Sequence, residues 1–380
     1  MPLSDIDLQK FRLKTDPVAD KVIEEIISTS GVESINTLFS QLRDNTDIPK
    51  SDMPEAVKTY FEQTKTLPNW IDQAKIKIGQ AVFAEHGPQI SLSLLCKSLP
   101  EAYACANGAK VLYATGRMTE RNGSLDVFTR RLMETAQFVV NVCSPGGLDP
   151  EGNGIITAQK VRLIHAAIRF YIKHHDRNWS TNQYGEPINQ QDMAGTLQSF
   201  STLIIEGLER MKLDLTEEQK EGYYHCWRVI GFIMGVEDEL NPPTYSEGYA
   251  LGQTILKSQI APSKEGVALT KAVCDFMGSM LPGAIYKDIP EIIIRFLVKD
   301  DIADDLGLEK HNTLKSKLVP ELLDELFLTM DKVENASHFM KKLIEHMNLF
   351  LLQHMLTHFN ENKKVRFYIP PNLRDDWEKR

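Results

Sequence analysis

Hydrophobic positions recur with helical spacing along nearly the whole chain. Apolar residues return every three or four positions, and no stretch keeps the alternation of a half-buried strand. One further helix is expected to start at Thr216, ahead of the apolar run YYHCWRVIGFIMG. The other helices are predicted over residues 16–39, 54–65, 125–142, 157–175, 189–211, 246–259, 264–280, 289–299 and 319–359. The sequence therefore predicts an all-α fold.

The most continuous apolar stretch covers residues 70–114, with breaks expected at Gly87, Pro88 and Pro100. Such a stretch is typical of helices buried on several sides, so the core is expected to begin there. We predict an N-terminal helical cover over 1–65, a core over 66–300 and a C-terminal helical extension over 301–380, packed as one unit with the core. Residues 349–359 are too short and too interrupted to cross a bilayer, so no transmembrane segment is predicted.

Helix-start signals and glycines give local detail. Asn189, followed three residues later by Asp192, is expected to begin a helix, as are Thr157 and Thr216. Gly231 and Gly235 are expected to share one helix face and permit close packing. The loop SPGGLDPEGNG follows a helix and not a strand, so its glycines favour turns over phosphate binding.

Composition narrows the class of protein. Among 380 residues, 42% are hydrophobic and 25% are charged, which is the balance of a folded globular protein. The net charge of −9 is spread without basic blocks, so no nucleic-acid partner is expected. Five scattered cysteines form no C-x-x-C pair, and the first residues lack a secretory pattern; both features predict a cytoplasmic protein with reduced thiols.

A histidine on the segment VRLIHAAIRFYIKHH is a candidate metal ligand. Arg162 lies three residues before His165 and Arg169 four residues after it, so all three share one side of the helix. Most lone helical histidines are structural. Two fixed positive charges, however, favour the neutral imidazole that binds metal, and guanidinium groups can pair with the carboxylates of a cofactor.

The sequence leaves two possible roles for each of three further residues. Arg131 and Thr135 are one turn apart and can present a cation and a hydroxyl to a ligand. Arg131 can equally be a surface cation, and Thr135 can bond back to its own helix. Thr196 is either a buried hydroxyl bonded to backbone or a donor in a pocket.

Four motifs together resemble the latex-clearing protein or rubber oxygenase family, which also includes a fungal mycophenolic-acid-pathway oxygenase. They are RRLMETAQFVVNVCSPGG, VRLIHA, EPINQQDMAGTLQSFS and YYHCWRVIGFIMGV, in the order of the family and within residues 70–243. The spacing between Arg131 and His165 also fits the family pattern.

The resemblance implies a globin-like helical core with noncovalently bound haem b, which uses O2 to cleave double bonds in isoprenoid chains. It implies that His165 is the proximal iron ligand, that Arg131 and Thr135 lie on the distal side, and that Thr196 lines the haem pocket. Where rubber-cleaving members carry a lysine, this chain has Glu134, for which we expect either pairing with Arg131 or exposure to solvent. The family's distal glutamate falls near residues 115–120, and no catalytic base is assigned.

The expected function is therefore a haem b-dependent oxygenase that acts on a small, apolar, unsaturated substrate inside the cell. The alternatives are a globin-like haem protein that only binds or senses a diatomic ligand, and a helical scaffold without haem. His354 and His358 lack the partners of a zinc site, and no Glu-x-x-His pairs indicate a di-iron centre. The sequence does not indicate an oligomeric state.

Overall fold

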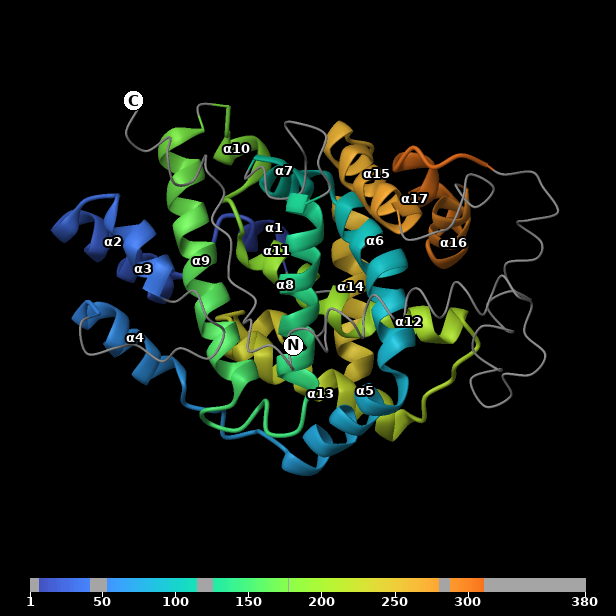
Figure 1. The fold of residues 1–380 in the computed structure, drawn as a ribbon, viewed down its shortest axis with the longest axis horizontal. Coiled ribbons are helices and arrows are strands. Elements are labelled where there is room, and N and C mark those ends of the chain that lie inside the picture. Colours follow the sequence, from blue (N-terminus) through green and yellow to red (C-terminus); the bar gives the residue numbers. More distant parts are fainter. Residues whose placement is uncertain (1–6, 42–52, 115–125, 177, 280–287, 311–380) are drawn as a thin grey trace.

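The fold is helical throughout the part of the chain that the structure, a computed structural model, describes. This part comprises residues 7–41, 53–114, 126–176, 178–279 and 288–310. Within these ranges there is no strand, and one isolated bridge joins Cys105 to Ile260. Figure 1 shows the helices gathered around a central group that contains α5, α8 and α13. The predicted all-α class is confirmed.

The N-terminal helices are α1 (Leu8–Phe11), α2 (Pro17–Ser30), α3 (Ser34–Gln41) and α4 (Glu55–Thr64). The prediction of one helix over 16–39 is wrong, because Gly31 has a φ of 78° and ends α2. Asp16 is the N-cap of α2, and Pro17 occupies the first turn, where a missing N–H costs nothing.

The apolar stretch after residue 70 forms α5 (Gln73–Ser93), the π-helical turn η2 (Leu94–Ser98), α6 (Leu99–Ala104) and α7 (Ala106–Ala114). A helix break was expected at Pro88, but no helix ends there. Pro88 lies inside α5, where His86 departs from helical geometry, so the chain kinks and continues. Pro100 occupies the first turn of α6.

Helices α8 (Asp126–Cys143) and α9 (Asn153–His175) form a hairpin closed by the glycine-rich loop. A side chain at Gly147 would place its Cβ 2.0 Å from the carbonyl oxygen of Asn141, so this loop is a tight turn, as predicted. The prediction that Thr157 caps α9 is wrong. The helix begins four residues earlier, and Thr157 donates back to the Asn153 carbonyl.

The remaining helices follow in order. Asn189 caps the first of the longer ones, and Thr216 forms a capping box with Gln219, which confirms both expected starts. The predicted helix over 189–211 is divided at Ser201. The bounds are α10 (Thr181–Tyr184), α11 (Gln190–Phe200), α12 (Thr202–Arg210), α13 (Glu217–Ile233), η3 (Asp238–Leu240), α14 (Tyr245–Gln259), α15 (Lys264–Ser279), α16 (Ile289–Leu297) and α17 (Asp300–Asp305).

Glycines let the central helices approach closely. A Cβ at Gly79 of α5 would lie 2.4 Å from the Gly222 carbonyl oxygen of α13, so these two helices pack backbone to backbone. Gly231 plays the predicted role, because its Cβ would lie 2.5 Å from the Leu197 side chain of α11. Gly235, in contrast, lies beyond the end of α13 with a φ of 77°.

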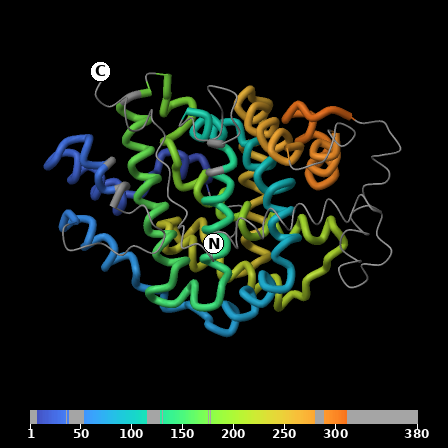
Figure 2. The backbone as a smooth tube through the Cα atoms, in the orientation of Figure 1, coloured from blue at the N-terminus to red at the C-terminus, as the bar shows by residue number. Residues whose placement is uncertain are grey.

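The N-terminal helices cover α9 and have their own small core. Apolar residues of α2, α3 and α4 pack against Leu163, Ala166 and Ala167 of α9. Figure 2 shows these blue segments on the left of the molecule, beside the green α9. The predicted helix over 319–359, with most of the C-terminal extension, lies outside the described residues.

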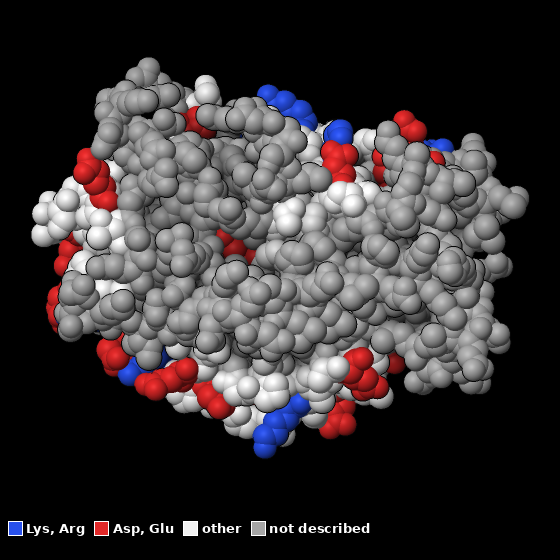
Figure 3. Space-filling view, in the orientation of Figure 1, with Lys and Arg blue, Asp and Glu red and all other residues white. Residues whose placement is uncertain are grey.

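Within the described ranges, no helix combines the length and apolarity needed to cross a membrane. The lower edge of the face in Figure 3 carries acidic and basic side chains in mixed order, with no basic patch.

Candidate functional site

The α8–α9 hairpin places two predicted site residues, Glu134 and His165, at nearly one level. Asn141 of α8 donates a hydrogen bond to the Thr157 hydroxyl of α9 at 2.9 Å, which sets the register of these antiparallel helices. Glu134 lies seven residues before Asn141, and His165 lies eight residues after Thr157. Because both helices rise equally per residue, Glu134 and His165 are at nearly the same height in the hairpin.

One face of α8 carries Arg131, Thr135 and Phe138, which are spaced by four and three residues. The Thr135 hydroxyl donates to the Arg131 carbonyl oxygen at 3.0 Å, which is the back-bonded geometry left open above. This bond uses the proton of the Thr135 hydroxyl. The hydroxyl oxygen can still accept a hydrogen bond from a ligand.

Glu134 pairs with Arg131, as one of the two expectations held. The Nη1 atom of Arg131 lies 3.4 Å from Oε2 of Glu134. The Glu134 side chain is only 2% exposed, so the solvent-facing alternative is wrong. Arg131 is 26% exposed and keeps most of its N–H donors for other partners.

Thr196 lies on α11, the helix whose Phe200 contacts α8. Phe200, one turn after Thr196, packs edge to face with Phe138 of α8 at 6.2 Å between ring centroids. Both rings also contact the buried Trp227 of α13. We call Phe138, Phe200 and Trp227 the aromatic cluster. Thr196 is exposed, and its hydroxyl donates to the Asp192 carbonyl oxygen at 2.8 Å.

His165 is partly buried on a side of α9 that turns toward α7 and the start of α11. Ile168 and Ile172, three and seven residues later, pack with Val111 of α7 and with Ile188 just before α11. The candidate site is thus bordered by α7, α8, α9 and α11. It offers one imidazole, one guanidinium and hydroxyl groups among apolar and aromatic side chains.

Arg162, for which a cofactor-binding role is expected, contacts protein groups. Its Nε and Nη2 atoms donate to the two oxygens of Asp16 at 2.6 and 2.7 Å, and Nη1 donates to the Ile233 carbonyl oxygen at 2.8 Å. Burial by itself would lower the pKa of Arg162, but the hydrogen bonds and charge of Asp16 outweigh it and raise the pKa.

Arg169 is engaged in the same way. It donates from Nε to Asp20 at 2.7 Å and from Nη1 to the Ile188 carbonyl oxygen at 3.2 Å. Both arginines do meet carboxylates, as expected from the chemistry of guanidinium groups, but these carboxylates belong to α2 and not to a cofactor.

Tyr103 of α6 is a further candidate that the sequence did not single out. It is 1% exposed, and its hydroxyl has no hydrogen-bond partner among the residues that the structure describes. Burial raises the pKa of Tyr103, while the positive charge of Arg131 acts in the opposite direction. In the sequence, Tyr103 is one apolar residue among many.

The set of metal-binding donors is limited. Across the described ranges, no three His, Cys, Asp or Glu side chains gather in an arrangement that could hold a metal ion. A non-haem iron site needs such a set, whereas haem iron needs a single axial side chain. The stretch 115–120, where the family's distal glutamate was expected, lies outside the described residues.

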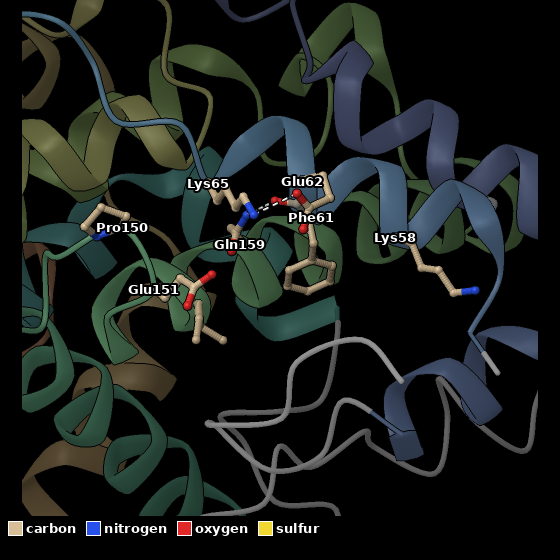
Figure 4. Close-up of a pocket in the computed structure, with 8 residues that line it drawn as sticks. Lys58, Phe61, Glu62, Lys65, Pro150, Glu151 and Gln159 are labelled. Carbon is tan, nitrogen blue, oxygen red and sulfur yellow. Dashed lines mark hydrogen bonds and ion pairs between the residues drawn. The ribbon is translucent and has the colours of Figure 1, made fainter. Parts of the chain in front are cut away.

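A pocket of about 310 Å³ lies elsewhere, between α4 and the start of α9. Figure 4 shows Phe61, Gln159 and the ion pair of Lys65 with Glu62 among the residues that line it. None of the predicted site residues lines this pocket.

Comparison with known proteins gives consistent results. The catalytic domain of the family described as ER-bound oxygenase mpaB/B'/Rubber oxygenase matches residues 92–324. A rubber oxygenase of Streptomyces sp. (strain K30) is 24% identical over 303 residues, which are 79% of this chain and 72% of that protein. The solved structure of latex clearing protein LCP in the closed state has the same fold, with a TM-score of 0.74, 21% identity and 91% coverage of both chains. The matched region includes all of α8, α9 and α11, and the chain therefore belongs to the ER-bound oxygenase mpaB/B'/Rubber oxygenase family, which implies an oxidoreductase.

Proposed function

We propose that this protein is a haem b-dependent oxygenase that uses O2 on a small, apolar, unsaturated substrate of isoprenoid type. The observation that carries the proposal is the α8–α9 hairpin, which holds His165 level with the Arg131, Glu134 and Thr135 turn. Family membership supports oxygenase chemistry. Rubber, named in the relative from Streptomyces, supports an isoprenoid substrate class.

The residues at the site fit haem in the chemistry of their donors. His165 would supply the axial imidazole, and the partly buried Phe138 and Phe200 would supply apolar surface for a flat macrocycle. Arg162 and Arg169 are not assigned to the propionates, because Asp16 and Asp20 already bind them. When bound, haem would supply an iron that activates O2.

The residues of α8 would act on charge that develops at the reacting oxygen atoms. Arg131 can donate hydrogen bonds from the N–H groups that Glu134 does not use. The Thr135 oxygen can accept a hydrogen bond, since its own proton is donated to the Arg131 carbonyl oxygen. The aromatic cluster of Phe138, Phe200 and Trp227 would keep water away from an apolar substrate.

The test is to express the protein with haem precursor, purify it and record its visible spectrum and pyridine haemochrome. We expect a Soret band and one haem b for each chain. Oxygen uptake is then measured with squalene, a carotenoid and a steroid, and the products are identified by mass spectrometry. A protein that takes up no haem would overturn the proposal. A haem protein that binds O2 reversibly and oxidises none of these substrates would instead be a ligand-binding or sensing protein.

A further inference from the structure

Three buried acid-base pairs connect the N-terminal segment to the two helices that carry His165 and Thr196. Arg12 pairs with Asp192 of α11 at 2.8 Å. Asp16 pairs with Arg162 and Asp20 with Arg169, both on α9, at 2.6 and 2.7 Å. We call Arg12, Asp16 and Asp20 the N-terminal clamp.

The contacts on α9 bracket the candidate ligand. Arg162 is one turn before His165 and Arg169 is one turn after it, so α2 binds α9 on both sides of the histidine. Asp16 receives two parallel hydrogen bonds from Arg162, which fix direction as well as distance. A rotation or slide of α9 would break both pairs, and it would also turn the His165 ring.

On α11, the N-terminal clamp binds one turn before Thr196. Asp192 is one turn before Thr196. Its carboxylate accepts hydrogen bonds from Arg12 and from the Asn189 side chain, at 2.8 Å each. Arg12 also donates to Gln259 of α14 at 2.8 Å. The clamp therefore ties the start of α11 to α14 and to the N-terminal segment.

Burial shows that these pairs are more than surface contacts. The side chains of Arg12, Arg162 and Arg169 are 6%, 9% and 2% exposed. Buried pairs add little net stability over apolar side chains of the same size, because both charges must leave water. Their best-supported benefit is to select one arrangement of the packed elements. Here the arrangement selected is the placement of α9 and α11.

We propose that the N-terminal clamp positions the haem site, with Asp16 and Asp20 as positioning residues that act on His165 through Arg162 and Arg169. The inference rests on the proposed function in assigning haem to His165. The family's catalytic-domain match begins at residue 92, so the clamp is supplied by a part of the chain that precedes the matched domain. The N-terminal helices would then be part of the site and not only a cover.

The test compares Asp16→Asn and Asp20→Asn with a matched control, Lys14→Met. Lys14 belongs to the same segment but pairs with Glu237, outside α9 and α11, at 2.6 Å. We expect the two clamp variants to lose haem to apomyoglobin about tenfold faster than wild type and to change the ferric EPR spectrum, as do changes next to metal ligands. Asp20→Glu, which keeps the charge, should restore the wild-type spectrum, and Lys14→Met should retain it.

A second measurement does not need haem. In haem-free protein, hydrogen exchange of the α9 peptide should quicken in both clamp variants and stay unchanged in Lys14→Met. If Asp16→Asn does not fold, Asp20→Asn decides, because its aspartate is 20% exposed and its loss is milder. Unchanged haem loss, EPR spectrum and α9 exchange in folded variants would overturn the clamp. A wild-type protein without haem would overturn the proposed function, and α9 exchange would still decide whether the clamp holds the helix.

Discussion

The carboxylate of Glu134 lies 3.4 Å from the guanidinium of Arg131, one turn away on α8, and is almost fully buried. A carboxylate bound to a cation is a weak competitor for iron, in contrast with the lysine expected at this position in rubber-cleaving relatives. Four predictions follow from the site and its surroundings.

His165→Ala should abolish stable haem binding, because in the proposed function this imidazole would be the one protein bond to the iron of a noncovalently bound haem b. The measurement is the Soret absorbance and haem content of protein purified after expression with haem precursor. His174→Ala is the control, since His174 is an exposed histidine on the same helix. An unchanged Soret band in His165→Ala would refute the assignment.

Arg131→Ala and Thr135→Ala should each leave haem bound and slow oxygen-dependent turnover. Loss of one donor that stabilises developing charge costs about 3 kcal/mol, or roughly a hundredfold in rate. Single-turnover oxygen consumption by haem-loaded variants would measure this loss. Thr135→Ser, which keeps the hydroxyl, should retain most activity. Full activity in both alanine variants would show that this face of α8 does not take part.

The ferric protein should have a sixth iron position that is empty or holds exchangeable water. Glu134 is paired with Arg131, and it stands where rubber-cleaving relatives carry the amine of a lysine. Titration with imidazole at several pH values should give complete conversion of the spectrum. Glu134→Lys should make ligand entry harder if the side chain reaches the iron, and Glu134→Gln is the matched neutral control. A wild-type spectrum of six-coordinate, strong-field iron that resists imidazole would contradict the prediction.

Stability should fall on mild acidification because of His225, outside the site. Its ring accepts a hydrogen bond from the Asp72 N–H at 2.9 Å, and burial, with Lys75 and Arg228 nearby, lowers its pKa to about 4. The unfolded chain, with a histidine pKa of about 6.5, binds more protons in this range, so stability decreases as the pH falls from about 6.5 to about 4.

His225→Gln keeps an acceptor that does not titrate, so its melting temperature should fall less than that of wild type between pH 7 and pH 5. The difference should be on the order of a few degrees. Equal slopes in both proteins would mean that His225 does not control this dependence. His174→Gln, at an exposed position, should follow the wild-type curve.

The sequence by itself determined the helical class and several helix starts. The caps at Asn189 and Thr216 are local, since the side chain and the N–H that it accepts from are three residues apart. The sequence also supplied the candidate site residues, through motifs that lie within the matched family domain. Pairing of Glu134 with Arg131 was one of two outcomes that the sequence left open, and a separation of three residues on one helix brings the two side chains together.

Only the tertiary structure decided where the arginines beside His165 point. Arg162 and Asp16 are 146 residues apart, so no helical periodicity relates them, and their bond depends on how α2 packs on α9. The same holds for Phe138 and Phe200, whose contact shows that α8 faces α11. Local patterns fix the helices because their hydrogen bonds join near neighbours, whereas the surroundings of each side chain depend on which helices meet, and this depends on packing across the whole core.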